Sequence, residues 1–395
     1  MLKSLFKKNY LYYGGSIAIS RGLEYFVLFF AAHYLAKDDY GELEYYKKVV
    51  EIGSNVLAFG FPALILSYTK SRESKVYFYL LSLIFVSCLS GVLLVSGFFQ
   101  PVGFFLILTM VFYALYFSGG IAQSYQIVHL GSNYASVYKI VISILFYGAV
   151  FGLIYLYQVE GMAYLYPSVL LLPFALIFSY FDFRKERITL QKIKKYWQLF
   201  KRLLSSSFTL VVSNFANLLF LYTDIFVIKW LSDSANSEIA DFSFALNVAG
   251  VLLIISMTLI QVDIEKLKAD SSFFYKLNGK IVALTVMASA MLILVYWILI
   301  NTWFQHFSAT FYLFLIILAG KVSLTISNLF GTQLVILKKF SLNLNINLVA
   351  LGLNVVACYI GYLYWALPGL ALASSCMLAL RLVVLWYYNK KLIPA

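Results

Sequence analysis

SIAISRGLEYFVLFFAAHYL (residues 16–35) has the length and apolarity of a membrane-spanning helix. A helix needs about 20 mostly apolar residues to cross the hydrocarbon core of a bilayer. Two charged residues interrupt the stretch, Arg21 and Glu24. A charge in hydrocarbon costs about 2.5 kcal/mol or more, so it normally faces protein or water and serves a function. The stretch therefore predicts a membrane protein with a polar site inside it.

The composition extends this prediction to the whole chain. Of its 395 residues, 62% are hydrophobic and only 12% are charged, whereas soluble domains carry about 25% charged residues. We therefore expect an all-α polytopic membrane protein of about twelve transmembrane helices. The expected spans are residues 11–36, 45–68, 76–98, 102–128, 135–157, 161–181, 206–231, 241–263, 280–300, 307–337, 342–364 and 366–388.

The longest basic stretch falls between the sixth and seventh expected spans. It reads RKERITLQKIKKYWQLFKRLL (residues 184–204). The expected domains are an N-terminal six-helix bundle over 1–183, a cytoplasmic linker over 184–204 and a C-terminal six-helix bundle over 205–395.

The basic residues also orient the chain. With the N-terminus inside, the inner segments hold 23 of the 30 basic residues, and the outer loops hold only Lys37. This asymmetry follows the positive-inside rule and predicts both termini in the cytoplasm. It explains the net charge of +13 without a nucleic-acid partner. The outer loops 37–44 and 232–241 are expected to be short and acidic.

Catalytic and cofactor motifs are not evident. No outer loop is long enough for the large external domain of a membrane polymerase, and no nucleophilic triad or carboxylate pair lies outside. Cys88, Cys358 and Cys376 sit singly in apolar runs, and the three histidines lack metal-ligand spacing. A phosphate-binding loop is also missing. We expect no enzyme, no metal and no cofactor, and leave open coupling to a proton or sodium gradient.

The charges in the first two spans allow two interpretations. Arg21 and Glu24 are three residues apart and share a helix face. They form either an internal ion pair or a site where Arg21 meets an anionic group in an aqueous cavity, because guanidinium grips phosphate in two places. Lys47 and Lys48, close to Glu51, either extend to the interface or flank the same cavity.

Span seven carries a polar stripe of Asn214, Asn217 and Asp224 along one side. Such a stripe faces the bundle interior, where the residues act as interhelical contacts. A second interpretation makes the buried Asp224 a proton-coupling group.

The last spans carry further basic residues. Lys321 and Asn328 share a face of span ten, and Lys321 is too deep to reach an interface, so we expect it to line the cavity. Arg381 lies closer to a helix end, and we expect it to extend to the inner headgroups. Basic groups outnumber acidic ones within the spans. A positive cavity walled by aromatic residues, among 32 tyrosines and 35 phenylalanines, suits a substrate with phosphate and sugar groups.

Several motifs together resemble one family. They are an internal arginine in span one, the YG turn at 40–41, FGFP at 59–62, Asp224 in span seven, GTQLVILKKF at 331–340 with Gln333 and Lys338–Lys339, Asn354, and PGLALAS at 368–374. The chain resembles bacterial polysaccharide, or O-antigen, flippases of the Wzx type, within the multidrug/oligosaccharidyl-lipid/polysaccharide exporter superfamily.

The resemblance implies two six-helix bundles around a central cavity that opens to each leaflet in turn. The implied cargo is an undecaprenyl-diphosphate-linked oligosaccharide, moved from the inner to the outer leaflet of the bacterial plasma membrane, and other polysaccharide-assembly membrane proteins are implied partners. Arg21 matches the family's basic cavity residues, whereas Lys47, Lys48 and Lys321 match by position only.

Three alternatives stay open. A drug/cation antiporter of the same superfamily would have a mainly acidic cavity. A peptidoglycan lipid-precursor flippase would carry more helices and more arginines in the first bundle. A membrane polymerase or glycosyltransferase would need an outer catalytic loop or a metal-binding DxD motif.

Overall fold

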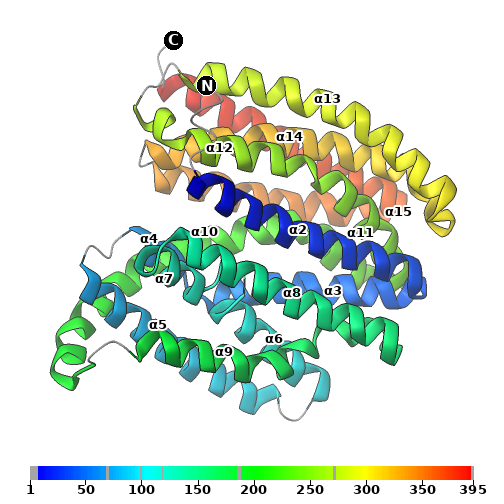
Figure 1. Cartoon of the computed structure of the whole chain (residues 1–395). Helices are drawn as coiled ribbons and strands as arrows, with labels where there is room; N and C mark the ends of the chain where they lie inside the picture. Colours follow the sequence, from blue (N-terminus) through cyan, green and yellow to red (C-terminus); the bar gives the residue numbers. More distant parts are fainter. Residues whose placement is uncertain are drawn as a thin grey trace. The chain divides into compact units, whose positions relative to one another are not determined.

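The computed structural model describes residues 8–67, 71–97, 100–117, 119–184, 188–269, 273–337 and 339–392, and within these ranges the regular structure is entirely helical. Both chain ends and residues 185–187 of the basic segment lie outside the described residues, as does Lys338 of the GTQLVILKKF motif. The helices, shown in Figure 1, are α2 (Lys8–Tyr34), α3 (Lys37–Leu57), α4 (Phe61–Ser67), α5 (Arg72–Gly97), α6 (Pro101–Leu115), α7 (Ile121–His129), α8 (Ser132–Tyr157), η1 (Gly161–Tyr164), α9 (Pro167–Phe183), α10 (Leu190–Leu231), α11 (Ala235–Gly250), α12 (Leu252–Ala269), α13 (Phe273–Thr302), η2 (Gln305–Thr310), α14 (Phe311–Ile336) and α15 (Phe340–Leu392).

Most of these helices have membrane-spanning length. Within the described ranges, 8 helical segments are long and apolar enough to cross a bilayer. The last of them, Ser341–Leu392, is 52 residues long, which is enough for two crossings. Two shorter apolar segments, Pro101–Leu115 and Gly161–Ile177, fall in the fourth and sixth expected spans. The prediction of an all-α polytopic membrane protein with about twelve spans is confirmed.

Two expected spans are interrupted rather than continuous. The chain turns between α3 and α4 at Phe59 and Gly60, which have φ angles of 50° and 66°. A second break separates α6 from α7, where Gly119 has a φ of 85°. Positive φ is a conformation that only glycine adopts without strain, so these glycines mark the breaks.

The outer loop expected over residues 37–44 is wrong, because these residues form the start of α3. The pair Tyr40–Gly41 is therefore helical and does not form a turn. The physical reason is visible in the sequence: Asp38 and Asp39 occupy the first helical turn, where negative charge is favourable beside the unpaired backbone amides.

The basic segment continues into span seven as one helix. α10 runs for 42 residues from Leu190 to Leu231. Its first part is held to α5, because Glu73 accepts hydrogen bonds from Lys192 and, at 3.2 Å, from the Tyr196 hydroxyl. The hydrogen bond to Glu73 holds the pKa of Lys192 above its ordinary value. The Tyr196 ring also stacks on Tyr77, with centroids 5.0 Å apart.

The chain divides into two compact units. Unit 1 comprises Met1–Leu35 and Glu42–Phe215, and unit 2 comprises Ala36–Gly41 and Ala216–Ala395. The boundary therefore falls inside α10, and the start of α3 belongs to unit 2. In unit 2 this start is tied down by an ion pair of 2.7 Å between Lys37 and Asp241 of α11. The Tyr40 ring also packs edge-on against Phe307 of η2.

Aromatic residues fill much of the core of each unit. In unit 1, Phe112 of α6 stacks on Phe146 of α8 with centroids 5.9 Å apart. In unit 2, Phe244 stacks on Phe307 at 4.3 Å. Offset and edge-on ring contacts add to the burial of apolar area, which accounts for many of the tyrosines and phenylalanines.

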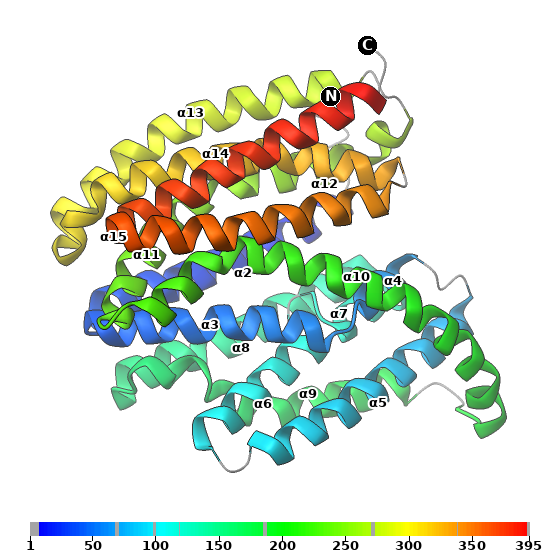
Figure 2. The same ribbon diagram turned by 180° about the vertical axis from the view of Figure 1, so that it is seen from behind.

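The helix α15 consists of two limbs joined by a kink. Trp365 and Ala366 have non-helical backbone angles, and the limbs on either side of them run back along each other (Figure 2). Gly361 and Gly369 face each other next to this kink: a Cβ on Gly369 would lie 2.1 Å from the carbonyl oxygen of Gly361. Two glycines therefore let the limbs approach closely at this end.

A similar close approach at Gly41 gives a test of the fold. A Cβ on Gly41 would lie 1.8 Å from the carbonyl oxygen of Asn236 in α11, whereas a Cβ on Gly22 in α2 would meet nothing within 4 Å. Overpacking costs about 1–3 kcal/mol, so we expect Gly41→Ala to lower the thermal unfolding temperature of the purified protein and Gly22→Ala to leave it unchanged or higher. Equal behaviour of the two variants would contradict this packing.

Candidate functional site

A buried group of charges lies in unit 1 between α2 and α3. Glu24 occupies its centre and bonds two basic residues at once. One carboxylate oxygen of Glu24 lies 2.7 Å from Nη1 of Arg21, and the other lies 3.0 Å from Nζ of Lys47. The structure thus brings together three of the predicted site residues.

The three side chains differ sharply in exposure. Glu24 is 9% exposed and Lys47 3% exposed, whereas Arg21 is 54% exposed. Glu24 and Lys47 therefore form a buried ion pair that fixes the packing of α2 on α3. Arg21 is anchored at one nitrogen by Glu24, and much of its guanidinium remains accessible. Arg21 thus has features of both interpretations: it forms an ion pair with Glu24, and its side chain remains accessible.

Lys48 extends the group along α3. Its Nζ lies 3.9 Å from Glu44 and 4.0 Å from Glu51. Both lysines are buried, so the interpretation in which they extend to the interface is wrong for Lys47 and Lys48. The reason is that Glu44, which we expected in an outer loop, lies within α3 and is buried beside Lys48.

The sequence analysis missed a further member of this group. Lys139 of α8 is buried, and it lies close enough to Arg21 for the two cations to repel each other. A hydrogen bond of 2.7 Å between Ser20 and Ser143 holds α8 against α2 at this level. The helical spacing of Lys139 and Ser143, one turn apart, was the only sequence signal for this placement.

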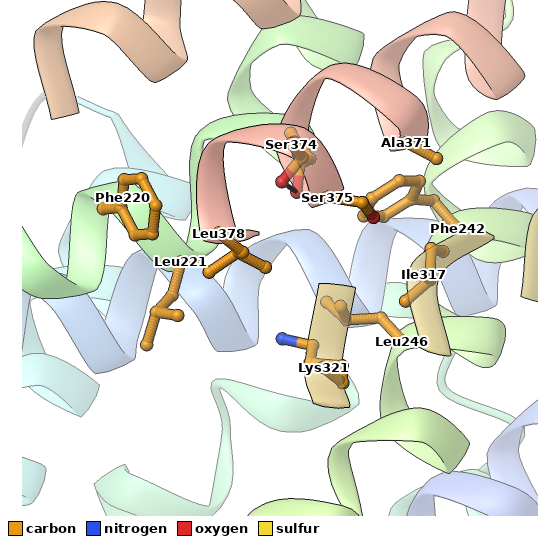
Figure 3. Close-up of a pocket in the computed structure, with 11 residues that line it drawn as sticks. Phe220, Leu221, Phe242, Leu246, Ile317, Lys321, Ala371, Ser374, Ser375 and Leu378 are labelled. Atoms are coloured by element: carbon orange, nitrogen blue, oxygen red, sulfur yellow. Dashed lines mark hydrogen bonds between the residues drawn. The ribbon is translucent and has the colours of Figure 1, made fainter. Parts of the chain in front are cut away.

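A second polar site lies in unit 2, in a small pocket lined by residues of α10, α11, α14 and α15. Asp224 of α10 and Lys321 of α14 both line it. Asp224 accepts hydrogen bonds from Ser374 at 3.1 Å and from Cys358 at 3.3 Å, both on α15. The Lys321 ammonium attracts the Asp224 carboxylate across the cavity. Figure 3 shows the Lys321 side chain extending into the cavity from α14, below Ser374 and Leu378 of α15.

The remaining predicted polar residues lie elsewhere. Asn328 donates a hydrogen bond of 3.2 Å to Ser256 of α12, so it acts as an interhelical contact and does not line the cavity with Lys321. Asn214 is exposed on α10 within unit 1. Asn217 accepts a hydrogen bond of 3.2 Å from Arg381. The three residues of the stripe expected along span seven thus lie in three different surroundings.

Among the predicted residues, Arg381 differs most from the position that we expected from the sequence. It does not extend to the headgroups: it is only 8% exposed, and its Nη2 donates to Asn217 of α10 and to Asn347 of α15 at 3.1 Å. Its guanidinium also lies over the Phe220 ring, 5.5 Å from the centroid. The two asparagines draw the side chain into the helix packing, which sequence spacing alone did not reveal.

No group of three or more histidine, cysteine, aspartate or glutamate side chains with the geometry of a metal site occurs in the described part of the chain. Two of the predicted basic residues lie at these sites: Arg21 in unit 1 and Lys321 in unit 2.

A family profile described as polysaccharide biosynthesis protein matches residues 6–264. The chain belongs to this family. No curated protein matches it in sequence. The fold of this polysaccharide biosynthesis protein resembles several solved transporters. The Lipid II flippase MurJ, in an inward closed conformation, matches at 15% identity with a TM-score of 0.65, over 96% of this chain and 87% of that one.

Two further structures show the same fold. A point mutant of the Vibrio cholerae MATE transporter VcmN matches at 12% identity with a TM-score of 0.64, over 99% of this chain and 96% of that one. A MOP superfamily transporter from Pyrococcus furiosus matches at 12% identity with a TM-score of 0.55, over 98% and 96%. The expected resemblance is thus confirmed for family and fold. The chain is a multi-pass membrane protein, and the solved structures that share its fold are transporters and a flippase.

The Glu24 contacts predict an unequal response to mutation in this polysaccharide biosynthesis protein. Glu24→Gln leaves the buried Lys47 without its ion-pair partner at Glu24, which costs about 3–5 kcal/mol. Removing both charges, in Glu24→Gln with Lys47→Met, should recover most of that loss. Arg21→Gln should cost at most about 1 kcal/mol, because exposed pairs contribute little. Unfolding of the purified protein by heat or by denaturing detergent measures these effects. If Arg21→Gln destabilised the protein as much as Glu24→Gln does, the division into buried pair and accessible arginine would be wrong.

Proposed function

We propose that this protein is a flippase for undecaprenyl-diphosphate-linked oligosaccharides. It moves the repeat unit from the inner to the outer leaflet of the bacterial plasma membrane by alternating access, for assembly of O-antigen, capsule or exopolysaccharide. The family match supports the pathway, and the fold supports a transporter. The observation that carries the proposal is the accessible Arg21 in the middle of a membrane-spanning helix.

The position of Arg21 along α2 is what makes its accessibility significant. It lies thirteen positions from each end of α2, Lys8 and Tyr34, or about 20 Å of helix on either side. An arginine exposed to lipid at that depth is costly, so its 54% exposure is best explained by an aqueous path. Glu24 holds Nη1 of the guanidinium, and a guanidinium has further donors that can pair with a phosphate.

Lys321 supplies a second cation, in unit 2. Its ammonium attracts the Asp224 carboxylate, and a phosphate that binds Lys321 competes with that carboxylate. Asp224 would then lose its counter-charge while remaining buried, and a proton taken up from solution would neutralise it. This exchange is our hypothesis for how a proton gradient is coupled to transport, with Asp224 as the coupling group.

A peptidoglycan lipid precursor is the alternative cargo, because it carries the same lipid diphosphate as the proposed one. The printed name of the MurJ neighbour is that of a Lipid II flippase. The two cargoes differ in their sugars and in the attached peptide, so a translocation assay with both lipids separates them.

The phosphate contacts predict the outcome of four substitutions. Arg21→Ala and Lys321→Gln should each lose most translocation of a fluorescent lipid-linked oligosaccharide in proteoliposomes, whereas Arg21→Lys and Lys321→Arg should keep part of it. Loss of one charge-assisted contact weakens binding about tenfold to a hundredfold. Lys280→Gln, at an exposed lysine of α13, is the control. Full activity of Arg21→Ala would remove the phosphate role, and loss of the protein from the membrane would favour a structural one.

The proposed orientation has its own test. The basic part of α10, around residues 190–204, and the chain end after Ala395 should lie in the cytoplasm. A cysteine placed at 233, in the connection between α10 and α11, should react with a membrane-impermeant thiol reagent added outside intact cells, and one placed at 194 should not. The background is a variant without Cys88, Cys358 and Cys376. External labelling at 194 would reverse the proposed topology.

A further inference from the structure

An apolar groove runs between the two limbs of α15 in unit 2. Its empty space, including the part open to the surroundings, is about 730 Å³. Every residue that lines it belongs to α15, from Leu342 to Leu353 on the first limb and from Met377 to Tyr388 on the second. Its rim includes the exposed side chains Val349, Leu353 and Leu380, which in a membrane helix face lipid chains.

Arg381 is the one charged residue among those that line the groove. Its Nη2 has two amide partners, but its Nε and Nη1 are buried and have no hydrogen-bond partner in the described structure. The described residues also supply no carboxylate within ion-pairing distance of Arg381. A buried cation without a counter-charge is strongly unfavourable, in contrast to Lys47, which is paired with Glu24. The groove therefore combines an apolar channel with an unneutralised positive charge.

The depth of Arg381 restricts which anion can reach it. It lies nine positions before Lys390, at the basic end of the second limb, or roughly 14 Å along the helix. Asn347, its partner on the first limb, lies eight residues from Lys339, or roughly 12 Å. Half the hydrocarbon thickness is about 15 Å. Arg381 thus lies well below the level at which the phosphate of a resting bilayer lipid is found.

We propose that this groove binds the lipid being transported, with its isoprenoid chain along the apolar walls and its phosphate on Arg381. An anionic lipid that crosses the bilayer passes this depth, whereas a resting phospholipid does not. Charge complementarity and the apolar lining both match a long-chain prenyl phosphate. The identity of the lipid rests on the proposed function, but the groove site is separate from Arg21 and Lys321. Because Nε and Nη1 are covered by neighbours, binding includes a turn of the Arg381 side chain toward the groove.

Binding of farnesyl diphosphate to the purified protein tests the site. We expect Arg381→Gln to weaken binding tenfold or more and Arg381→Lys to weaken it less. Removing an uncompensated charge should not impair folding, and thermal unfolding of each variant checks this.

Two tryptophan substitutions test the groove itself. Val349→Trp fills it from the lipid side and should weaken binding, whereas Val356→Trp, seven residues further along the same exposed helix face but outside the groove, should not.

Three competitors identify what the site recognises. Farnesol supplies the chain alone, inorganic pyrophosphate supplies the phosphates alone, and phosphatidylglycerol in mixed micelles supplies a bilayer phosphate. We expect each to compete at least tenfold less well than farnesyl diphosphate. Equal competition by farnesol would remove the role of Arg381, and equal competition by phosphatidylglycerol would make the groove a site for bilayer lipid. Either result overturns the proposal.

The same variants separate this inference from the proposed function. If the wild-type protein fails to translocate lipid-linked oligosaccharide, yet Arg381→Gln and Val349→Trp weaken farnesyl diphosphate binding, the groove site is supported and the proposed function is wrong. If translocation is observed and both variants bind and translocate as well as wild type, the proposed function is supported and the groove site is wrong.

Discussion

A charge in the hydrocarbon layer must find a partner, and this constraint organises the structure around Glu24. By bonding Arg21 and Lys47 at once, Glu24 joins α2 to α3 and determines which of the two cations is buried. Lys47 becomes a packing element, and Arg21 keeps donors accessible. The neighbouring pairs of Lys48 with Glu44 and Glu51 leave α3 charged and yet buried. A helix of this composition is stable in a membrane protein only because its charges neutralise one another.

The two units satisfy the same constraint differently. Unit 1 gathers most of its buried charge into one group of opposite signs. Unit 2 distributes its charges: Asp224 and Lys321 attract each other across a small cavity, while Arg381 is held only by amides and an aromatic ring. Unit 1 therefore holds its buried charges in groups that neutralise one another, whereas in unit 2 the Arg381 guanidinium has amide partners and no carboxylate partner among the described residues.

The sequence predicted the fold class well and the site only in part. Apolar runs of about 20 residues are a strong signal, because a membrane leaves few alternatives for the backbone. Breaks at Gly60 and Gly119, and the continuity of α10, were missed because apolarity does not report backbone angles. Lys321 lies beside Asp224 in a small pocket within unit 2, and its place in a central transport cavity stays a prediction. Glu44, Lys139 and the buried state of Arg381 were missed because their partners lie on other helices, and spacing along one helix says nothing about those partners.

The ion pair between Lys37 and Asp241 has a consequence for biogenesis. The two residues are 204 positions apart in the chain, and ribosomes add about 5–20 residues per second. Lys37 therefore waits roughly 10–40 s before its partner has been made, while α3 is already leaving the ribosome. Unit 2 thus contains a segment synthesised before most of unit 1. The two units cannot mature strictly one after the other, and the start of α3 must remain undocked until α11 has been made.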